Sequence, residues 1–195
     1  MKLKALLYCT KAKPYLYKTE DTTYPAYPIG YHTDKDLKLK LSNTNELANL
    51  NGKIVAECDF EVEKLEMISV YDEYDYDFDY HPYKTTLPQV LKSSCLTFDE
   101  LCSHLKYNDG YAIHIKNLHI FDKPRELNKF TKDNTDAIDY APSKMIHIWY
   151  YDKILEKWKR SIYVPVSSQE LCRILNKEQT VLVRRNVLKE MLKNE

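Results

Sequence analysis

Lysine and tyrosine side chains near the start of the chain have the chemistry needed to hold a nucleotide. Lys11 and Lys13 supply ammonium groups for phosphate oxygens, and Tyr8 and Tyr15 supply rings on which a base can stack. Single-strand binding clefts combine these two kinds of group. Lysines at the start of a helix are also commonly just solvated, so the pattern leaves both interpretations open.

An aromatic pair late in the chain is a second candidate for base stacking. Trp149 and Tyr151 are two residues apart, and His147 falls on the same face of the strand that this stretch predicts. Aromatic strand faces also fill cores. Trp149 is therefore a candidate ligand-binding residue with a structural alternative.

Histidines and cysteines lack the spacing of a metal site. Five residues along one strand put His114 and His119 on opposite faces, and Cys102 with His104 lacks a second close pair. No Gly-rich phosphate loop, Gly-x-Ser-x-Gly elbow or His-Glu-x-x-His stretch occurs in the sequence. We therefore expect neither a metal ion nor another cofactor.

The composition favours one soluble domain. The 195 residues are 44% hydrophobic, which suffices for a buried core with appended elements. No apolar run approaches the roughly 18–20 residues that span a bilayer, and the first residues turn polar too soon for a secretory signal. Five cysteines in apolar patterns indicate buried thiols rather than a disulfide framework. We expect a cytoplasmic protein with no membrane partner.

Charge is unevenly distributed although the net charge is zero. Residues 57–79 hold ten carboxylates and one lysine, whereas residues 153–193 hold ten Lys or Arg and four Glu. Opposed fields on one molecule are therefore possible. Arginine occurs at only five positions, which argues against sequence-specific DNA recognition by an arginine-rich surface.

Two segments that each open on a glycine are the clearest strands. In residues 52–65 apolar side chains alternate with charged ones, as a half-buried strand requires. In residues 110–127 the apolar set changes phase at residues 116–117, which predicts a β-bulge or a tight bend. The inward residues are expected to be Ile113 and Ile115 before the break, and Leu118 and Ile120 after it.

Shorter signals predict the remaining elements. Residues 3–7 predict a strand, followed by a short helix from about Thr10 to Tyr17, and residues 18–50 predict an extended loop or insertion. Capping boxes at residues 97–100 and 167–170 begin two helices. Residues 145–151 and 161–166 alternate as strands, with Pro165 at an edge or a strand end. Residues 181–192 predict an amphipathic helix.

An acidic, aromatic stretch at residues 71–80 alternates with a period of two. The pattern predicts a strand with one aromatic face, or else an acidic loop rich in tyrosine. Its carboxylates are suited to a basic partner protein or to imitation of a phosphate backbone, and equally to a solvated strand face.

Three stretches in this order resemble the ASCH family, a branch of the PUA-like superfamily often found in phage and prophage genomes. They are Leu6-Leu-Tyr-Cys-Thr-Lys-Ala-Lys-Pro-Tyr-Leu16, Leu50-Asn-Gly-Lys-Ile-Val-Ala-Glu57, and Ser94-Cys-Leu-Thr-Phe-Asp-Glu-Leu101 leading into Gly110-Tyr-Ala-Ile-His-Ile115 and Asp122-Lys-Pro-Arg-Glu-Leu127. The resemblance implies an α+β fold, a PUA-like mixed β-barrel with flanking helices. The barrel domain would span residues 1–150 with the insertion at about 18–50, and residues 151–195 would add a C-terminal strand and helices to it.

The resemblance also implies a cleft beside the first helix that binds RNA or a modified nucleotide. In this chain the cleft would use Tyr8, Lys11, Lys13 and Lys53, and Trp149 is the further candidate.

Some bacterial members of the family use this cleft as an amidohydrolase on acylated cytidine. Their catalytic glutamate matches Glu100, which is also the last residue of a capping box, and their Gly-x-Lys stretch is matched only loosely by Lys18 and Thr19. We therefore predict a binding module rather than an enzyme. The alternatives are a small amidohydrolase on an acylated nucleoside, and a phage-type protein that engages a host protein through residues 71–80.

Overall fold

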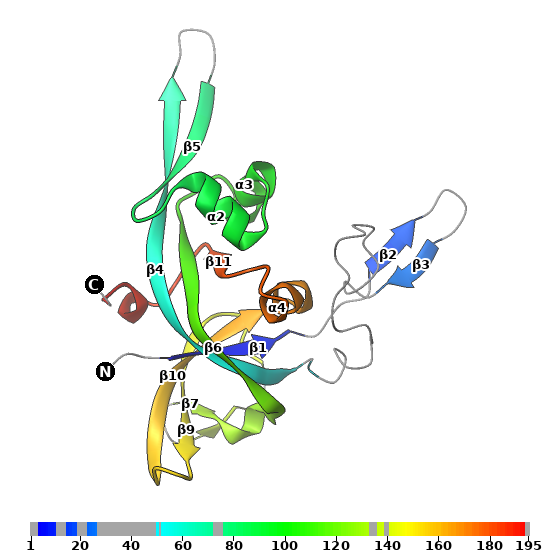
Figure 1. Cartoon of the computed structure of the whole chain (residues 1–195), viewed down its shortest axis with the longest axis vertical. Coiled ribbons are helices and arrows are strands. Elements are labelled where there is room, and N and C mark those ends of the chain that lie inside the picture. The colour runs from blue at the N-terminus through cyan, green and yellow to red at the C-terminus, as the bar shows by residue number, and fades with distance from the viewer. Residues whose placement is uncertain are drawn as a thin grey trace. The chain divides into compact units, whose positions relative to one another are not determined.

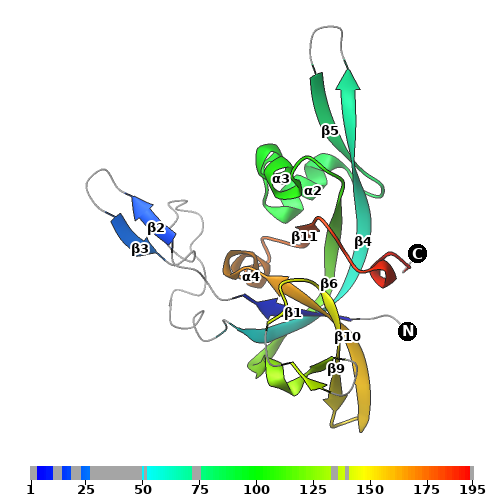
Figure 2. The same cartoon turned by 180° about the vertical axis from the view of Figure 1, so that it is seen from behind.

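The computed structural model describes residues 4–10, 15–18, 23–26, 50, 52–71, 76–132, 136–138 and 141–193. These residues form a mostly stranded structure with three α-helices, so the α+β class is confirmed (Figure 1; Figure 2 gives the view from behind). The chain divides into two units, each described by itself. Unit 1 comprises mainly residues 3–58 and 118–177, and unit 2 comprises residues 59–117 and 178–195. No helix of the described residues is long and apolar enough to cross a membrane.

Two long strands contribute residues to both units. They are β4 (Lys53–Tyr71) and β6 (Gly110–Glu126). Gly52 directly precedes β4 with a φ of 78°, a conformation that glycine adopts without strain. Within β4 the expected inward residues are buried, namely Ile54, Ala56, Cys58, Phe60 and Val62.

Unit 1 is built on β1 (Lys4–Cys9), which lies between two other strands. It pairs in parallel with β10 (Lys157–Val166) and antiparallel with β4. The order continues from β10 to β9 (Ile146–Asp152), β7 (Thr131–Lys132) and β8 (Asp136–Ala137). Unit 1 also contains the 3-10 turn η1 (Leu127–Lys129), the helix α4 (Ser168–Leu175), and a separate pair of β2 (Tyr15–Lys18) with β3 (Thr23–Ala26).

The core of unit 1 is aromatic and aliphatic. Residues 5–9 of β1 are buried on both faces of the strand, which fits their continuous apolar run. One face contributes to a cluster around two fully buried rings, those of Phe130 and Tyr163. The other members are Leu6, Tyr8, Ile54, Phe121, Ile138 and Ile148, with Leu127, Ile146 and Tyr150 packed against them.

Unit 2 pairs β11 (Val181–Arg184) with β6, and β5 (Tyr76–Pro82) with β4. Its helices are α2 (Leu87–Ser94) and α3 (Phe98–Leu105), and the 3-10 turn η2 (Lys189–Lys193) follows β11. Side chains from these strands and helices form one core cluster: Leu65, Tyr80, Val90, Leu101, Cys102, Leu105, Ala112, Val181 and Val183. Burial raises the pKa of the Tyr80 phenol to about 12.

Capping boxes begin all three described helices. Those at residues 97–100 and 167–170 confirm the sequence prediction. A third box, between Thr86 and Gln89, begins α2, a helix that the sequence reading missed. Cys95 and Lys106 end α2 and α3 in the left-handed conformation, with φ of 56° at each.

The predicted break in residues 110–127 is confirmed at Asn117. This residue has a φ of 49°, and the strand continues on either side of it. The inward set after the break was partly wrong, because Ile120 is 45% exposed and Phe121 is buried. Phe121 is an even number of residues from buried Ile113, so the buried face keeps its phase across Asn117 instead of shifting by one residue as the sequence predicted.

Three predictions of the fold were wrong. The described strands run from β11 to β8 with two ends, so they do not close into the expected barrel. Residues 15–18 form a strand paired with β3 rather than the end of a helix; residues 11–14 lie outside the described residues. Residues 181–184 form β11 rather than a helix, because three consecutive apolar residues rich in valine suit a strand buried on both faces.

We expect Gly110→Ala to destabilise unit 2 by about 1–3 kcal/mol through overpacking. A Cβ at residue 110 would lie 2.8 Å from the Cδ1 of buried Leu105 and closer still to its Cδ2. Leu105→Ala alone removes a core side chain and should cost about 2–5 kcal/mol. That truncation also makes room for the new methyl group. In urea unfolding, the double variant should therefore lose less stability than the two single variants lose together. Additive costs would contradict this packing.

Candidate nucleic-acid interface

Tyr8 cannot be the stacking surface that the sequence suggested. Its side chain is only 4% exposed in β1, and its ring packs against Tyr163 with 5.0 Å between centroids. Burial, the largest cause, raises the pKa of its phenol. Tyr8 belongs to the buried cluster of unit 1, so it is a core residue.

The predicted lysines are not gathered into one described site. The Nζ of Lys53 lies 3.2 Å from a carboxylate oxygen of Glu126, a partly exposed pair worth little stability. Lys18 lies in β2 opposite Thr23. Lys11 and Lys13 lie outside the described residues, so their role stays a prediction.

Trp149, by contrast, lies in a row of groups suited to a ligand. In β9 it faces Arg160 of β10 directly, and the Arg160 guanidinium lies 5.8 Å from the centre of the Trp149 ring. This is a cation–π distance. Directly opposite residues in a sheet share a face, so both side chains lie on the same side of the hairpin.

The next row on this face is aromatic and open to solvent. Tyr151 and Trp158 face each other with ring centroids 5.7 Å apart in an edge-to-face arrangement. Their exposures are 47% and 46%, so both rings are accessible to a ligand. We call Trp149, Tyr151, Trp158 and Arg160 the aromatic ladder.

Two buried polar atoms beside the ladder have no hydrogen-bond partner among the described residues. They are the Nε of Arg160 and the Oγ1 of Thr131, a residue that pairs with Trp149 from β7. A buried polar atom without a partner costs about 1–3 kcal/mol, so such atoms often mark a place where a ligand or water binds. The row Thr131–Trp149–Arg160 therefore combines a ring, a cation and unused hydrogen-bonding capacity.

The hairpin that carries the ladder is held in shape by Asp152. Its Oδ1 accepts hydrogen bonds from the backbone N–H groups of Ile154 and Leu155 at 3.0 and 3.1 Å, and its other oxygen lies 2.5 Å from Lys159. The Lys159 ammonium, followed by these backbone N–H groups, lowers the pKa of the Asp152 carboxyl. The turn is completed by Glu156 with a φ of 46°. The ladder is thus presented on a preformed scaffold.

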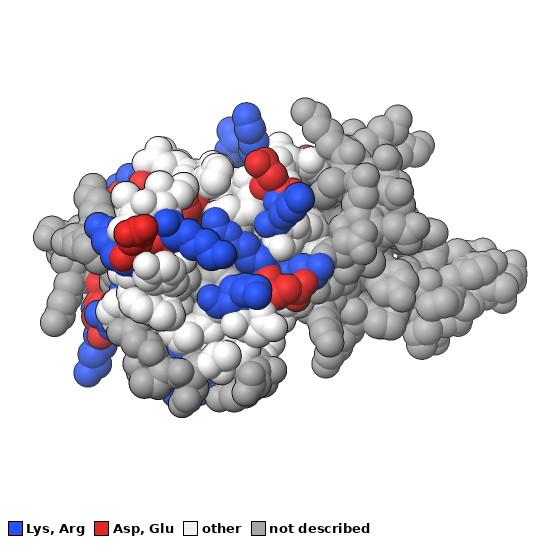
Figure 3. Space-filling model, turned by 90° about the horizontal axis from the view of Figure 1, so that it is seen from below, with Lys and Arg blue, Asp and Glu red and all other residues white. Residues whose placement is uncertain are grey.

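Exposed basic side chains occur on the hairpin and elsewhere in unit 1. Lys153 and Lys157 are exposed near its turn, and Lys123 and Lys129 are exposed at and just after the end of β6 in the same unit. Figure 3 looks at the end of the molecule where Figure 1 places the β9–β10 turn, and shows Lys and Arg side chains running across this face, with acidic ones between them. Such a surface attracts a polyanion.

The opposite face of the hairpin is part of the core of unit 1. Tyr150 is half-buried there, 5.9 Å from Phe130, and burial raises the pKa of its phenol, with a further rise from Glu57. The Arg125 guanidinium covers the nearby Phe121 ring at 3.9 Å from its centre. Alternation along β9 therefore sends Tyr150 into the core and its neighbours Trp149 and Tyr151 to the ladder.

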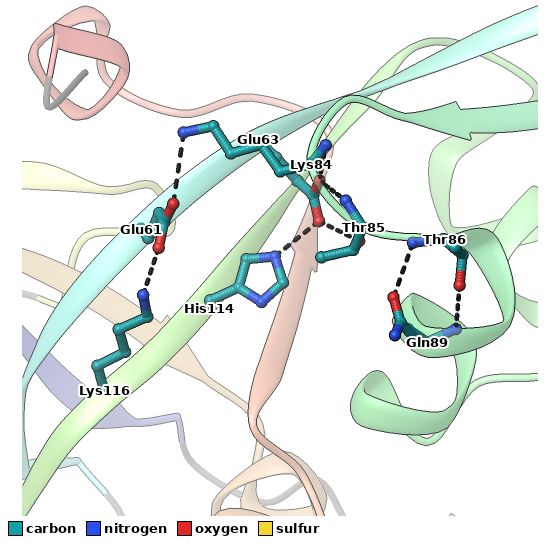
Figure 4. A network of polar contacts seen from close by, with 8 residues as sticks. All are labelled: Glu61, Glu63, Lys84, Thr85, Thr86, Gln89, His114 and Lys116. Atoms are coloured by element: carbon teal, nitrogen blue, oxygen red, sulfur yellow. Dashed lines mark hydrogen bonds and ion pairs between the residues drawn. The ribbon is translucent and has the colours of Figure 1, made fainter.

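Unit 2 holds the most connected polar network, centred on Glu63 (Figure 4). Its carboxylate accepts bonds from the Thr85 hydroxyl at 2.6 Å and from the backbone N–H groups of Lys84 and Thr85 at 2.8 and 3.0 Å. The Nε2 of His114 lies 2.7 Å from the same carboxylate. Next to it, the partly exposed Glu61 pairs with the ammonium groups of Lys84 and Lys116.

The network is structural, because three bonds to Glu63 tie the segment before α2 to β4, and the bond with His114 ties β6 to β4. Burial raises the pKa of Glu63, but the bonds from Thr85, His114 and the Lys84 N–H together lower it by more, so the pKa lies below its usual value. The sequence reading placed Glu63 on the solvent side of β4, yet its side chain is fully buried. Alternation alone cannot reveal such a residue.

Glu100 is engaged in its own helix cap. Its Oε2 accepts from the Thr97 N–H at 2.8 Å and from the Thr97 hydroxyl at 3.1 Å. No lysine of the described residues forms an ion pair with it, so the geometry gives the amidohydrolase alternative no support.

Only part of the acidic stretch at residues 71–80 is described. Residues 72–75 lie outside the described residues, and β5 begins at Tyr76. The strand prediction is confirmed for the second half, where Tyr80 is buried and Phe78 packs against the core of unit 2. Asp77 and Asp79 accept bonds from the backbone N–H groups of the residues that follow them. A partner for this stretch stays a prediction.

Among the described residues, no group of three or more His, Cys, Asp or Glu side chains is placed to hold a metal ion. Comparisons with models of known protein families, with curated proteins and with solved structures found no match. The resemblance to the ASCH family therefore stays a prediction.

Glu63→Gln should lower the stability of unit 2 by about 2–4 kcal/mol near pH 7, because it removes a buried charge on which several donors converge. The lowered pKa of Glu63 means that its contribution is present above the unfolded value of 4.5 and is lost as the pH falls through the folded value. The difference between the two proteins should therefore shrink in urea unfolding below about pH 4.

Glu66→Gln is the matched control, because Glu66 lies on the same strand as Glu63 but is partly exposed, and its partners Tyr83 and Lys64 are solvent-accessible as well. It should cost less than about 1 kcal/mol. Hydrogen exchange at the Lys84 and Thr85 amides gives a local measure and should accelerate only in Glu63→Gln. Equal effects of the two substitutions would contradict the structural role of Glu63.

Proposed function

We propose that this protein binds single-stranded RNA or a nucleotide through the aromatic ladder of unit 1. The observation that carries the proposal is the pair of cross-strand rows, Trp149 with Arg160 and Tyr151 with Trp158. The first row joins a ring to a cation, and the second offers two exposed rings. The ASCH resemblance implies the same class of ligand.

Stacking is the first contribution to binding. Successive bases of a single strand stack on aromatic side chains, and each stack is worth about 1–3 kcal/mol. Tyr151 and Trp158 are each nearly half exposed, so neither needs to leave a core to meet a base. Rings on adjacent strands are also spaced closely enough for neighbouring bases to use both.

The phosphate is the second contribution. Arg160 has an Nε without a partner among the described residues, and a guanidinium binds phosphate oxygens through a planar fork of donors. The exposed Lys153 and Lys157 near the turn add positive charge along the same hairpin. Base identity is not read by such contacts, so we expect little sequence preference.

We expect Trp158→Ala and Tyr151→Ala each to weaken binding of labelled oligouridine by about 1–3 kcal/mol in an anisotropy titration. Arg160→Gln should weaken binding and make the slope of log K against log salt shallower by about 0.7, the value for one phosphate contact on a single strand. Since Tyr151 and Trp158 are exposed, their loss should leave the unfolding transition nearly unchanged.

Two matched controls lie in unit 2. Tyr83→Ala removes a more exposed tyrosine, and Arg185→Gln removes an exposed arginine. Neither should change the affinity by more than about twofold, because salt screens the effect on binding of one exposed charge outside the ladder. Binding that ignores the ladder but falls in Lys11→Ala, Lys13→Ala would move the site to the start of the chain. The proposal would be refuted if neither the ladder variants nor Lys11→Ala, Lys13→Ala changed the affinity, and if the affinity did not depend on the salt concentration.

A further inference from the structure

The turn of the β9–β10 hairpin presents aliphatic side chains to solvent. Ile154 is 92% exposed, the highest value among the large hydrophobic residues that the structure describes, and Leu155 next to it is 51% exposed. Turn positions normally carry Gly, Asn, Asp, Ser or Pro. Aliphatic side chains here have no role in the turn itself and offer nothing to a stacked base, so the ladder does not account for them.

The turn is also held in one conformation. Both exposed residues donate their backbone N–H groups to the Oδ1 of Asp152, and Asp152 in turn is paired with Lys159. The pairing of β10 with β1 begins only at Ser161, and the pairing of β9 with β7 extends only to Trp149. The described neighbouring strands of unit 1 therefore do not cover the turn. A fixed apolar tip costs less conformational entropy on burial than a mobile loop.

The order of residue types along the hairpin matches the layers of a lipid surface. Ile154 and Leu155 form the tip, and the rings of Tyr151 and Trp158 come next. Beyond them lies the row of Trp149 with Arg160. Aliphatic groups prefer the acyl region, tyrosine and tryptophan the interface, and lysine and arginine the headgroups.

The charge of the hairpin selects the kind of lipid. Residues 152–160 contain four basic side chains, Lys153, Lys157, Lys159 and Arg160, and two acidic ones, Asp152 and Glu156. Asp152 is already paired with Lys159. Lys153 and Lys157 are exposed on either side of the tip, where they would meet the headgroups. Anionic headgroups complement this arrangement, and each nearby cation strengthens the attraction.

We propose that the tip of the β9–β10 hairpin, Ile154 and Leu155, inserts into the surface of an anionic lipid bilayer, with Tyr151 and Trp158 at the interface. The attachment is peripheral and does not depend on the proposed RNA binding, although both use the rings of Tyr151 and Trp158. Because one short tip buries little area, the attachment is reversible.

The test is cosedimentation of the full chain with phosphatidylcholine vesicles that contain or lack phosphatidylglycerol. We expect binding only to the anionic vesicles, and Ile154→Ser, Leu155→Ser should reduce the partition coefficient about tenfold or more by removing the apolar tip. In a Trp149→Phe background, the emission of Trp158 should shift to the blue with vesicles and be quenched by brominated lipid. A double change of Ile68→Ser and Ile120→Ser, at exposed isoleucines of β4 and β6 rather than of the hairpin, is the matched control and should leave binding unchanged.

The two proposals fail separately. Loss of vesicle binding in Ile154→Ser, Leu155→Ser with unchanged oligouridine affinity supports lipid insertion. Vesicle binding that persists in this variant, or that occurs without any shift of Trp158 emission, overturns it and leaves only charge attraction. Absence of binding to anionic vesicles also overturns it and points to a protein pocket as the partner of the tip. None of these outcomes bears on the ladder variants tested with oligouridine.

Discussion

The parallel pairing of β1 with β10 is the constraint on which unit 1 depends. It joins residues from the start of the chain to residues more than 150 positions later, and it fixes Lys4 opposite Ser161 and Cys9 opposite Val166. This register determines which β10 side chains enter the core. Because β9 pairs with β10, it also determines which β9 side chains enter the core. A slip of one residue would turn Arg160 toward the core and Tyr163 away from its core cluster. The ladder exists because the core on the other face permits no such slip.

Unit 2 depends on a polar constraint instead. Glu63 is buried in the middle of β4, and its charge is acceptable there only because four donors surround it. The donors come from β6 and from the segment that leads into α2, so the charge fixes that segment as firmly as apolar packing would. Sequence alternation predicted a solvated glutamate, since the three-dimensional position of Thr85 and His114 is not visible along the chain.

Local patterns predicted what local physics determines. The alternation of β4, the capping boxes of α3 and α4, and the break at Asn117 all depend on residues within a few positions of one another. Patterns failed where a distant strand decided the outcome. Residues 15–18 and 181–184 have spacings compatible with a short helix, yet each pairs with another strand. Tyr8 looked available because nothing near it in sequence shows that β10 and β4 enclose it.

Only half of the ladder could be predicted from sequence, because the other half depends on a pairing between two strands. The period of two placed Trp149 and Tyr151 on one face, but Trp158 and Arg160 join them only through the register of the hairpin. Exposed rings, an arginine nitrogen without a partner among the described residues, and an aliphatic turn each carry a cost that folding alone does not offset. Their concentration on one hairpin, while the opposite face is well packed, is more simply explained by binding than by loose packing. Loose packing would leave gaps on both faces, and the Tyr150 face adjoins fully buried Phe130 and Ile148.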